Sequence, residues 1–184
     1  PPSTVTIPAV ANYPPFRPVE VTGAELTAML AAAPELASIR QGARLFKDAE
    51  AQSVPRAPGT SSSRATSSSD SSAANGDEDQ DSDQDKAQTI TAGPLLWSPV
   101  AGTEIVVLTG KSRSASWIAA FHRLPDHGYR LASSMLFERE SGPIALSTRE
   151  RTRRELGWSL GWNVPGESGA VTWRDDHRVV IVQR

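Results

Sequence analysis

The chain has 184 residues, of which 38% are hydrophobic and 6% aromatic, and its formal net charge is −2. It contains no Cys, which excludes disulfides, thiol catalysis and thiolate metal sites. No apolar run approaches the roughly 20 residues that a membrane-spanning helix needs. Charge is unevenly spread, since residues 1–58 are neutral, residues 59–88 carry −5 and residues 89–184 carry +3. This distribution predicts three parts: an arm, an acidic linker and a folded domain.

The first part of the arm is rich in proline, with six prolines in the first 18 residues. Proline disfavours both helix interiors and sheet ladders, so we expect an extended or polyproline-like segment. Tyr13 and Phe16 flank Pro14-Pro15, a pattern typical of arms that lie in a groove of another protein or of their own domain. A solvated tail with a few apolar residues is the alternative interpretation.

The arm continues with two predicted amphipathic helices, over residues 24–32 and 34–47. Thr22 and Glu25 form a capping box at the start of the first helix, and Pro34 suits the first turn of the second. The apolar faces consist of Leu26, Met29, Leu30 and Ala33 on the first helix and of Leu36, Ile39, Ala43 and Phe46 on the second. Helices shorter than about 12–15 residues are marginal in water, so these faces must cover either the chain's own domain or a partner.

The arm therefore leads to the main functional hypothesis, a non-catalytic interaction or accessory module that needs no cofactor. We expect it to dock on a protein partner as a subunit of a larger assembly, such as one in a bacterial cell envelope. The candidate partner-binding residues are Tyr13, Phe16, Leu26, Met29, Leu30, Leu36, Ile39 and Phe46. The Pro1-Pro2 start and the absence of Cys favour a periplasmic or cell-surface location, although the cytoplasm fits the absence of Cys nearly as well.

Residues 59–88 are low in complexity and contain no hydrophobic residue larger than Ala, so we expect a disordered Ser/Asp-rich spacer. The alternating Asp residues from Asp77 to Asp85 resemble the start of a calcium loop. That loop also needs Gly at its sixth position and Glu at its twelfth, which Ser82 and Gln88 occupy here. The sequence therefore favours a solvated spacer over a calcium site.

Residues 89–184 hold all five Trp residues and form the predicted domain. Strand-like runs separated by turn signals fall at residues 95–99, 104–109, 115–123, 129–138, 143–147, 157–162, 170–174 and 178–183. Residues 115–124 also fit a helix, but a Pro-Asp-His-Gly turn that leads straight into an alternating run favours the strand. A capping box at Ser147 and Glu150, with Gly157 as a stop, predicts one short helix over residues 147–157. The expected fold class is α+β and mainly antiparallel β: a small meander, sandwich or partly open barrel.

Two patterns in the domain resemble ligand sites but lack essential parts. Residues 109–112 read Thr-Gly-Lys-Ser, like the end of a phosphate-binding loop, but Ile105 stands where that loop requires its first Gly. A hairpin turn is the better interpretation. The histidines, His122, His127 and His177, show no metal-ligand spacing, and we interpret them as surface residues.

Two further functions stay open as alternatives. A small hydrolase with an unrecognised Ser/His or carboxylate site is formally possible, although no Ser lies in a Gly-x-Ser-x-Gly elbow. A nucleic-acid-binding domain could use the arginines of residues 149–154 (Arg149, Arg151, Arg153 and Arg154) as phosphate contacts. Glu150 and Glu155 dilute that basic patch, which favours an ordinary solvated surface.

Overall fold

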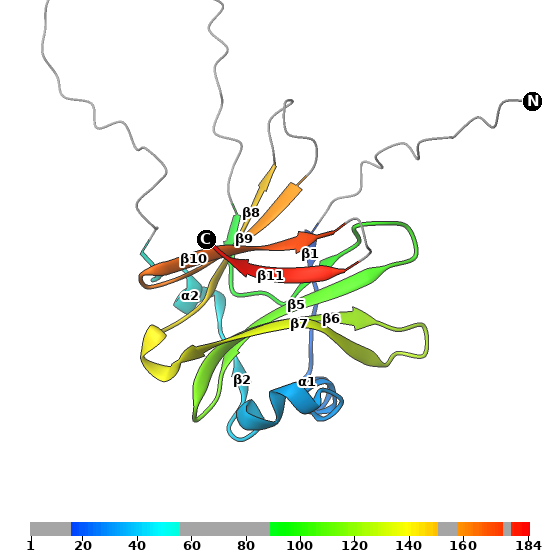
Figure 1. The fold of residues 1–184 in the computed structure, drawn as a ribbon, viewed down its shortest axis with the longest axis horizontal. Coiled ribbons are helices and arrows are strands. Elements are labelled where there is room, and N and C mark those ends of the chain that lie inside the picture. The colour runs from blue at the N-terminus through cyan, green and yellow to red at the C-terminus, as the bar shows by residue number, and fades with distance from the viewer. Residues whose placement is uncertain (1–15, 56–88, 151–157, 175–177) are drawn as a thin grey trace, which may run out of the picture.

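The computed structural model describes residues 16–55, 89–150, 158–174 and 178–184, which form two antiparallel sheets and a few short helices (Figure 1). In chain order the elements are β1 (Phe16–Pro18), α1 (Gly23–Ala31), the 3-10 helix η1 (Pro34–Ile39), β2 (Arg44–Leu45), α2 (Asp48–Ala51), β3 (Thr89–Thr91), β4 (Leu95–Trp97), β5 (Glu104–Lys111), β6 (Ala115–Arg123), β7 (Tyr129–Glu138), the 3-10 helix η2 (Arg139–Ser141), β8 (Ala145–Glu150), β9 (Trp158–Val164), β10 (Glu167–Trp173) and β11 (Val179–Gln183). The expected class, mainly antiparallel β, is confirmed, and the two sheets do not close into a barrel.

The first sheet has the order β1-β4-β5-β6-β7, and β2 pairs with the end of β5 that β4 does not reach. Its central strands β5 and β6 read as near-continuous apolar runs because both of their faces are covered. Val106, Trp117 and Phe121 pack against α1 and η1, whereas Ile105 and Ile118 pack against the second sheet. The molecule therefore has three layers: helices, first sheet and second sheet (Figure 1).

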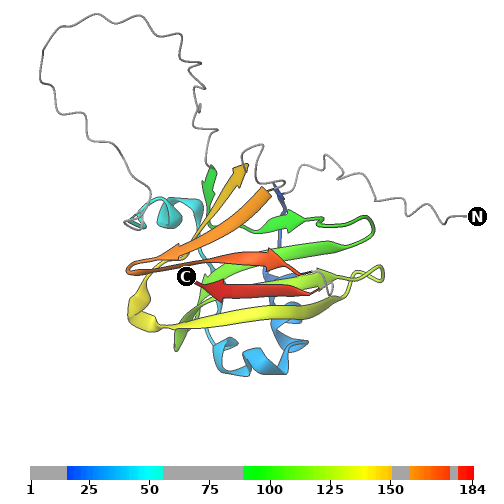
Figure 2. The same ribbon diagram turned by 45° about the horizontal axis from the view of Figure 1, so that its top comes forward.

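The second sheet has the order β11-β10-β9-β8-β3 and supplies Leu146, Leu160 and Trp162 to the core between the sheets. The two sheets meet along β7 and β11, which Figure 2 shows side by side. There the backbone N–H of Ile181 donates to Ser133 Oγ at 3.2 Å. This seam joins the edge strands through a side chain rather than through a regular ladder.

The first helix of the arm is confirmed, one residue earlier than expected at each end. Glu25 N donates to Thr22 Oγ1 at 3.2 Å, and Thr22 N donates to Glu25 Oε2 at 2.9 Å, which completes the capping box. Met29 and Leu30 are buried under the first sheet. The arm in its described part thus covers the chain's own sheet, one of the two possibilities that its apolar stripe left open.

The second predicted helix, over residues 34–47, is wrong beyond Ile39. Pro34 does start a helical segment, but it is the 3-10 helix η1, and Gly42 then turns the chain at a φ of +70°. Residues 44 and 45 instead form β2, where β5 satisfies their backbone groups. Backbone hydrogen bonds to strand β5 thus replace the last turns of the helix that the amphipathic pattern predicts.

The helix predicted over residues 147–157 is wrong in its first part, because residues 145–150 form strand β8. Neighbours on both sides, β3 and β9, supply the backbone partners that a helix would have made internally. Residues 115–123 form β6, so the strand interpretation of the ambiguous run is confirmed.

Several predictions fall outside the described residues. These are the Pro-rich start with Tyr13, the linker with Asp77 to Asp85, His177, and Arg151, Arg153 and Arg154. Among the helices that are described, none is long and apolar enough to cross a membrane.

Candidate binding surface

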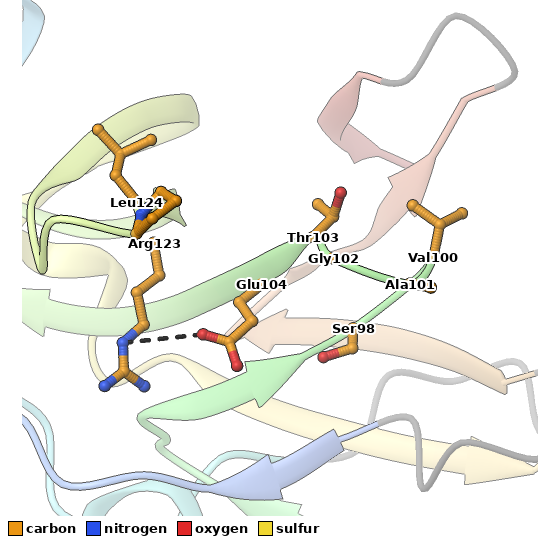
Figure 3. A pocket seen from close by; sticks show the side chains of 9 residues that line it. Ser98, Val100, Ala101, Gly102, Thr103, Glu104, Arg123 and Leu124 are labelled. Carbon is orange, nitrogen blue, oxygen red and sulfur yellow. Dashed lines mark ion pairs between the residues drawn. The ribbon is translucent and has the colours of Figure 1, made fainter.

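A shallow open concavity of about 320 Å³ lies at one end of the first sheet, between the β4–β5 turn and the end of β6 (Figure 3). Its lining residues are Ser98, Val100, Ala101, Gly102, Thr103, Glu104, Arg123, Leu124 and Pro125. In Figure 3, Val100 and Leu124 stand on opposite sides, and Glu104 lies between them. The walls are therefore two turns, and the ends of central strands form the base.

Local sequence explains both walls. Gly102 has a φ of +79°, which closes the turn, and Thr103 N donates to Val100 O at 3.2 Å. On the opposite wall, Leu124 N donates to Gly128 O at 2.8 Å, and Asp126 Oδ1 accepts from Gly128 N at 3.0 Å. This second turn is the Pro-Asp-His-Gly turn expected from the sequence.

One ion pair lies at the base of the concavity. Glu104 and Arg123 are directly opposite each other in the β5–β6 ladder, and Arg123 Nε lies 3.8 Å from Glu104 Oε2. The two side chains keep 43% and 34% of their surface exposed, respectively. A long, solvated pair of this kind contributes little to stability, so both charges remain available to a ligand.

An aromatic cluster lies at the same end of the first sheet, where Trp97 ends β4 one residue before Ser98, and its side chains face the second sheet. Phe16 of β1 stacks on Trp97 with a centroid distance of 5.2 Å, and Trp173 of β10 meets Trp97 edge-on at 6.3 Å. Trp97 is buried, whereas Phe16 and Trp173 are half-buried. We call the concavity and these three aromatic residues together the tip surface.

The structure separates the predicted partner-binding residues into three groups. Phe16 belongs to the tip surface, and Tyr13 lies outside the described residues. The remaining six are buried inside the molecule: Leu26, Met29, Leu30, Leu36 and Ile39 under the first sheet, and Phe46 between the sheets. In this conformation these six side chains contact the chain's own core and leave Phe16 as the accessible member.

Two of the three histidines, His122 and His127, lie within the described residues. His122 is half-buried at the end of β6, and its pKa is lowered, first by burial and then by the charge of Arg130. His127 lies in the exposed turn with a φ of +64°. Across the described residues, no group of three or more His, Cys, Asp or Glu side chains could hold a metal ion.

The Thr-Gly-Lys-Ser run proves to be the end of β5 and the start of a hairpin turn, as expected. Ser112 N donates to Ala115 O at 2.8 Å, and Ser112 Oγ accepts from Ala115 N at 3.2 Å. Strand β6 follows at once, where a phosphate-binding loop would continue into a helix.

Sequence reasoning did not identify Trp97, Trp173 and Arg123 as members of a candidate site. The only available signal was position, since each stands at the last residue of its strand, just before a turn. At the ends of strands, side chains from both sheets can lie close together.

Comparison of the chain with protein-family models, curated proteins and solved structures found no match.

Proposed function

We propose that the protein is a non-catalytic binding module that docks on a partner protein through the tip surface. The observation that carries this proposal is the gathering at one end of the first sheet of Phe16, Trp97 and Trp173, two of them half-buried, and of an open concavity with a loosely paired Arg123. Aromatic residues and Arg supply most of the strong contacts in protein interfaces. As in the sequence-based hypothesis, the module is a subunit of a larger assembly.

The shape of the concavity favours a protein over a small substrate. Pockets that enclose small ligands bury most of the ligand's surface, whereas this one is walled by two exposed turns and is open to solvent. A side chain or loop of a partner can enter such a depression while the partner's surface reaches over the end of the sheet to the half-buried Phe16 and Trp173. Arg123 and Glu104 can then exchange their mutual contact for contacts to the partner.

A photo-reactive amino acid in place of Val100 tests the proposal in the native host. The matched control carries the same residue in place of Thr27, which is exposed on α1 in the helical layer. We expect one protein to cross-link through position 100 and not through position 27. Equal cross-linking from both positions, or a nucleic acid as the product at position 100, would contradict the proposal.

Charge reversal then measures the contribution of the tip surface to affinity. Arg123→Glu should weaken binding of the purified cross-linked partner by about 10-fold or more, because it removes a cation and places two carboxylates together. Arg139→Glu is the matched control, since Arg139 is an exposed arginine in η2, outside the tip surface. An equal loss in both variants would indicate a non-specific charge effect.

A further inference from the structure

The described residues on the two sides of segment 56–88 lie close together. Gln52 Nε2 donates to Ile90 O at 2.9 Å, just beyond the two ends of the segment. Asp48 Oδ1 also accepts from Thr91 Oγ1 at 2.7 Å and from Ala92 N at 2.9 Å. Residues 56–88 are thus an insertion between α2 and β3, two elements that contact each other directly.

Residues 16–55, which we call the strap, complete the fold on the N-terminal side of this insertion. Strand β1 pairs with β4 from Phe16↔Trp97 to Pro18↔Leu95, and β2 pairs with β5. Val19 N extends the first pairing with a 3.1 Å bond to Pro94 O. The strap therefore fills open edges of the first sheet at two separate places.

The strap also covers the outer face of the first sheet. Met29, Leu36 and Ile39 are 0% exposed, and they share one core cluster with Leu108, Trp117 and Phe121 of β5 and β6. Without the strap those sheet residues would face water, which is unfavourable for large apolar side chains. The helices in turn are too short to persist alone.

We propose that the strap is held by these contacts alone, so that residues 89–184 form a receptor face for residues 16–55 and the chain can be cut within 56–88 without losing its fold. The receptor face consists of the outer side of β5 and β6 and the free edges of β4 and β5. The ligand is the chain's own strap, bound through an apolar helix face and two short edge strands. This inference does not rest on the proposed function, although the strap supplies Phe16 to the tip surface.

A cut within residues 56–88 leaves the contacts of the folded protein in place but makes folding depend on two separate pieces meeting. In the intact chain the strap is presented at an effective concentration on the order of millimolar, so at roughly 10 µM a cut protein should show an about 100-fold lower ratio of folded to unfolded molecules. Unfolding of the cut protein then also separates the two pieces. Its midpoint temperature must therefore rise with protein concentration, whereas that of the intact chain stays constant.

The experiment uses the full chain with a specific protease site placed within residues 59–88 and cleaved after folding. We expect the two pieces to elute together at the volume of the uncut protein, with a melting temperature that rises with concentration. The proposal is overturned if the pieces separate or precipitate on cleavage. It is also overturned if the larger piece melts at the temperature of the uncut protein at every concentration, because that piece would then not need the strap.

A pair of variants tests whether the named contacts hold the cut protein together. Ile39→Ala removes a side chain that is fully buried under the sheet, and Glu35→Ala changes an exposed residue of the same helix η1. After cleavage, Ile39→Ala should release the strap at a concentration at which Glu35→Ala and the parent stay associated. Equal association of all three would show that the strap is held elsewhere.

Discussion

Each of the two sheets contains a tryptophan packed over a glycine of the neighbouring strand, but the two arrangements differ in their hydrogen bonds. In the first sheet Trp117 of β6 is paired directly with Gly110 of β5, and in the second Trp162 of β9 is paired with Gly169 of β10. In both cases the indole ring lies across the glycine, where a Cβ atom would collide with the ring and with a carbonyl oxygen of the next strand. That carbonyl belongs to Arg44 in β2 and to Val182 in β11.

The difference lies in the hydrogen bond of the indole nitrogen. Trp162 Nε1 donates to Val182 O at 3.1 Å, whereas Trp117 Nε1 is buried with no hydrogen-bond partner among the described residues. The third strand, which carries the carbonyl beside the glycine, has five residues in the second sheet (β11) and two in the first (β2). The same steric arrangement thus includes a satisfied donor where the third strand is long, and an unsatisfied one where the third strand belongs to the strap.

The largest expected effect comes from adding a methyl group at either glycine. Gly110→Ala and Gly169→Ala should each destabilise the protein by about 3 kcal/mol or more, because a rigid carbonyl and a buried ring must both move. Urea unfolding at constant pH measures the loss. If the first sheet is the looser of the two, Gly110→Ala will cost less than Gly169→Ala, since β2 can shift more easily than β11.

The control for this pair is a glycine with free space around it. Gly23 lies at the start of α1 without a positive φ, and a Cβ atom added to it would meet no other group within 4 Å. Gly23→Ala should therefore be neutral or stabilise the protein by up to about 1 kcal/mol. A loss at Gly23 as large as at the two paired glycines would show that the strand effect is not steric.

The second-largest expected effect concerns the hydrogen bonding of the two indole nitrogens. Trp162→Phe and Trp117→Phe both remove ring volume from the core, but only Trp162→Phe also removes a hydrogen bond, that from Nε1 to Val182 O. We expect Trp162→Phe to cost about 1 kcal/mol more than Trp117→Phe. Equal costs, measured by the same urea unfolding, would mean that the bond to Val182 contributes nothing.

The sequence predicted much of the sheet because the strands carry their own patterns. Apolar content and the turns between the runs predict β5, β6 and β7. The same reasoning failed at residues 44–45 and 147–150, where amphipathic or capping patterns predicted helix. In both places the deciding partner is a strand far away in the sequence, which no local pattern reports.

The tip surface was harder to predict than the fold. Phe16 is a candidate from the sequence because it flanks Pro14-Pro15, but its neighbours Trp97 and Trp173 are 81 and 157 positions away along the chain. The buried candidates had a correct apolar pattern, and only the structure shows that the chain's own sheet covers them. An apolar stripe thus predicts that a surface is covered, and not which surface covers it.

The smallest expected effect concerns the ion pair that holds the short third strand of the first sheet. Glu50 accepts from Arg44 Nη2 at 2.7 Å and Nη1 at 3.0 Å, and from the backbone N–H of Lys47 at 2.8 Å. These bonds, that from Arg44 foremost, lower the pKa of Glu50 from 4.5 to about 2. A lowered pKa stabilises the fold above pH 4.5, and this contribution is lost as the pH falls towards 2.

Comparison of Glu50→Gln with the parent isolates this contribution from that of other carboxylates. The difference in unfolding free energy should be no more than about 1 kcal/mol, because both side chains are partly exposed. It should be constant above pH 4.5 and shrink towards pH 2. Glu35→Gln, which changes a carboxylate at an exposed position, is the matched control. A difference that does not change with pH would mean that β2 is held by its ladder to β5 alone. In that case the short third strand needs no charge pair, and the contrast with β11 would be one of length only.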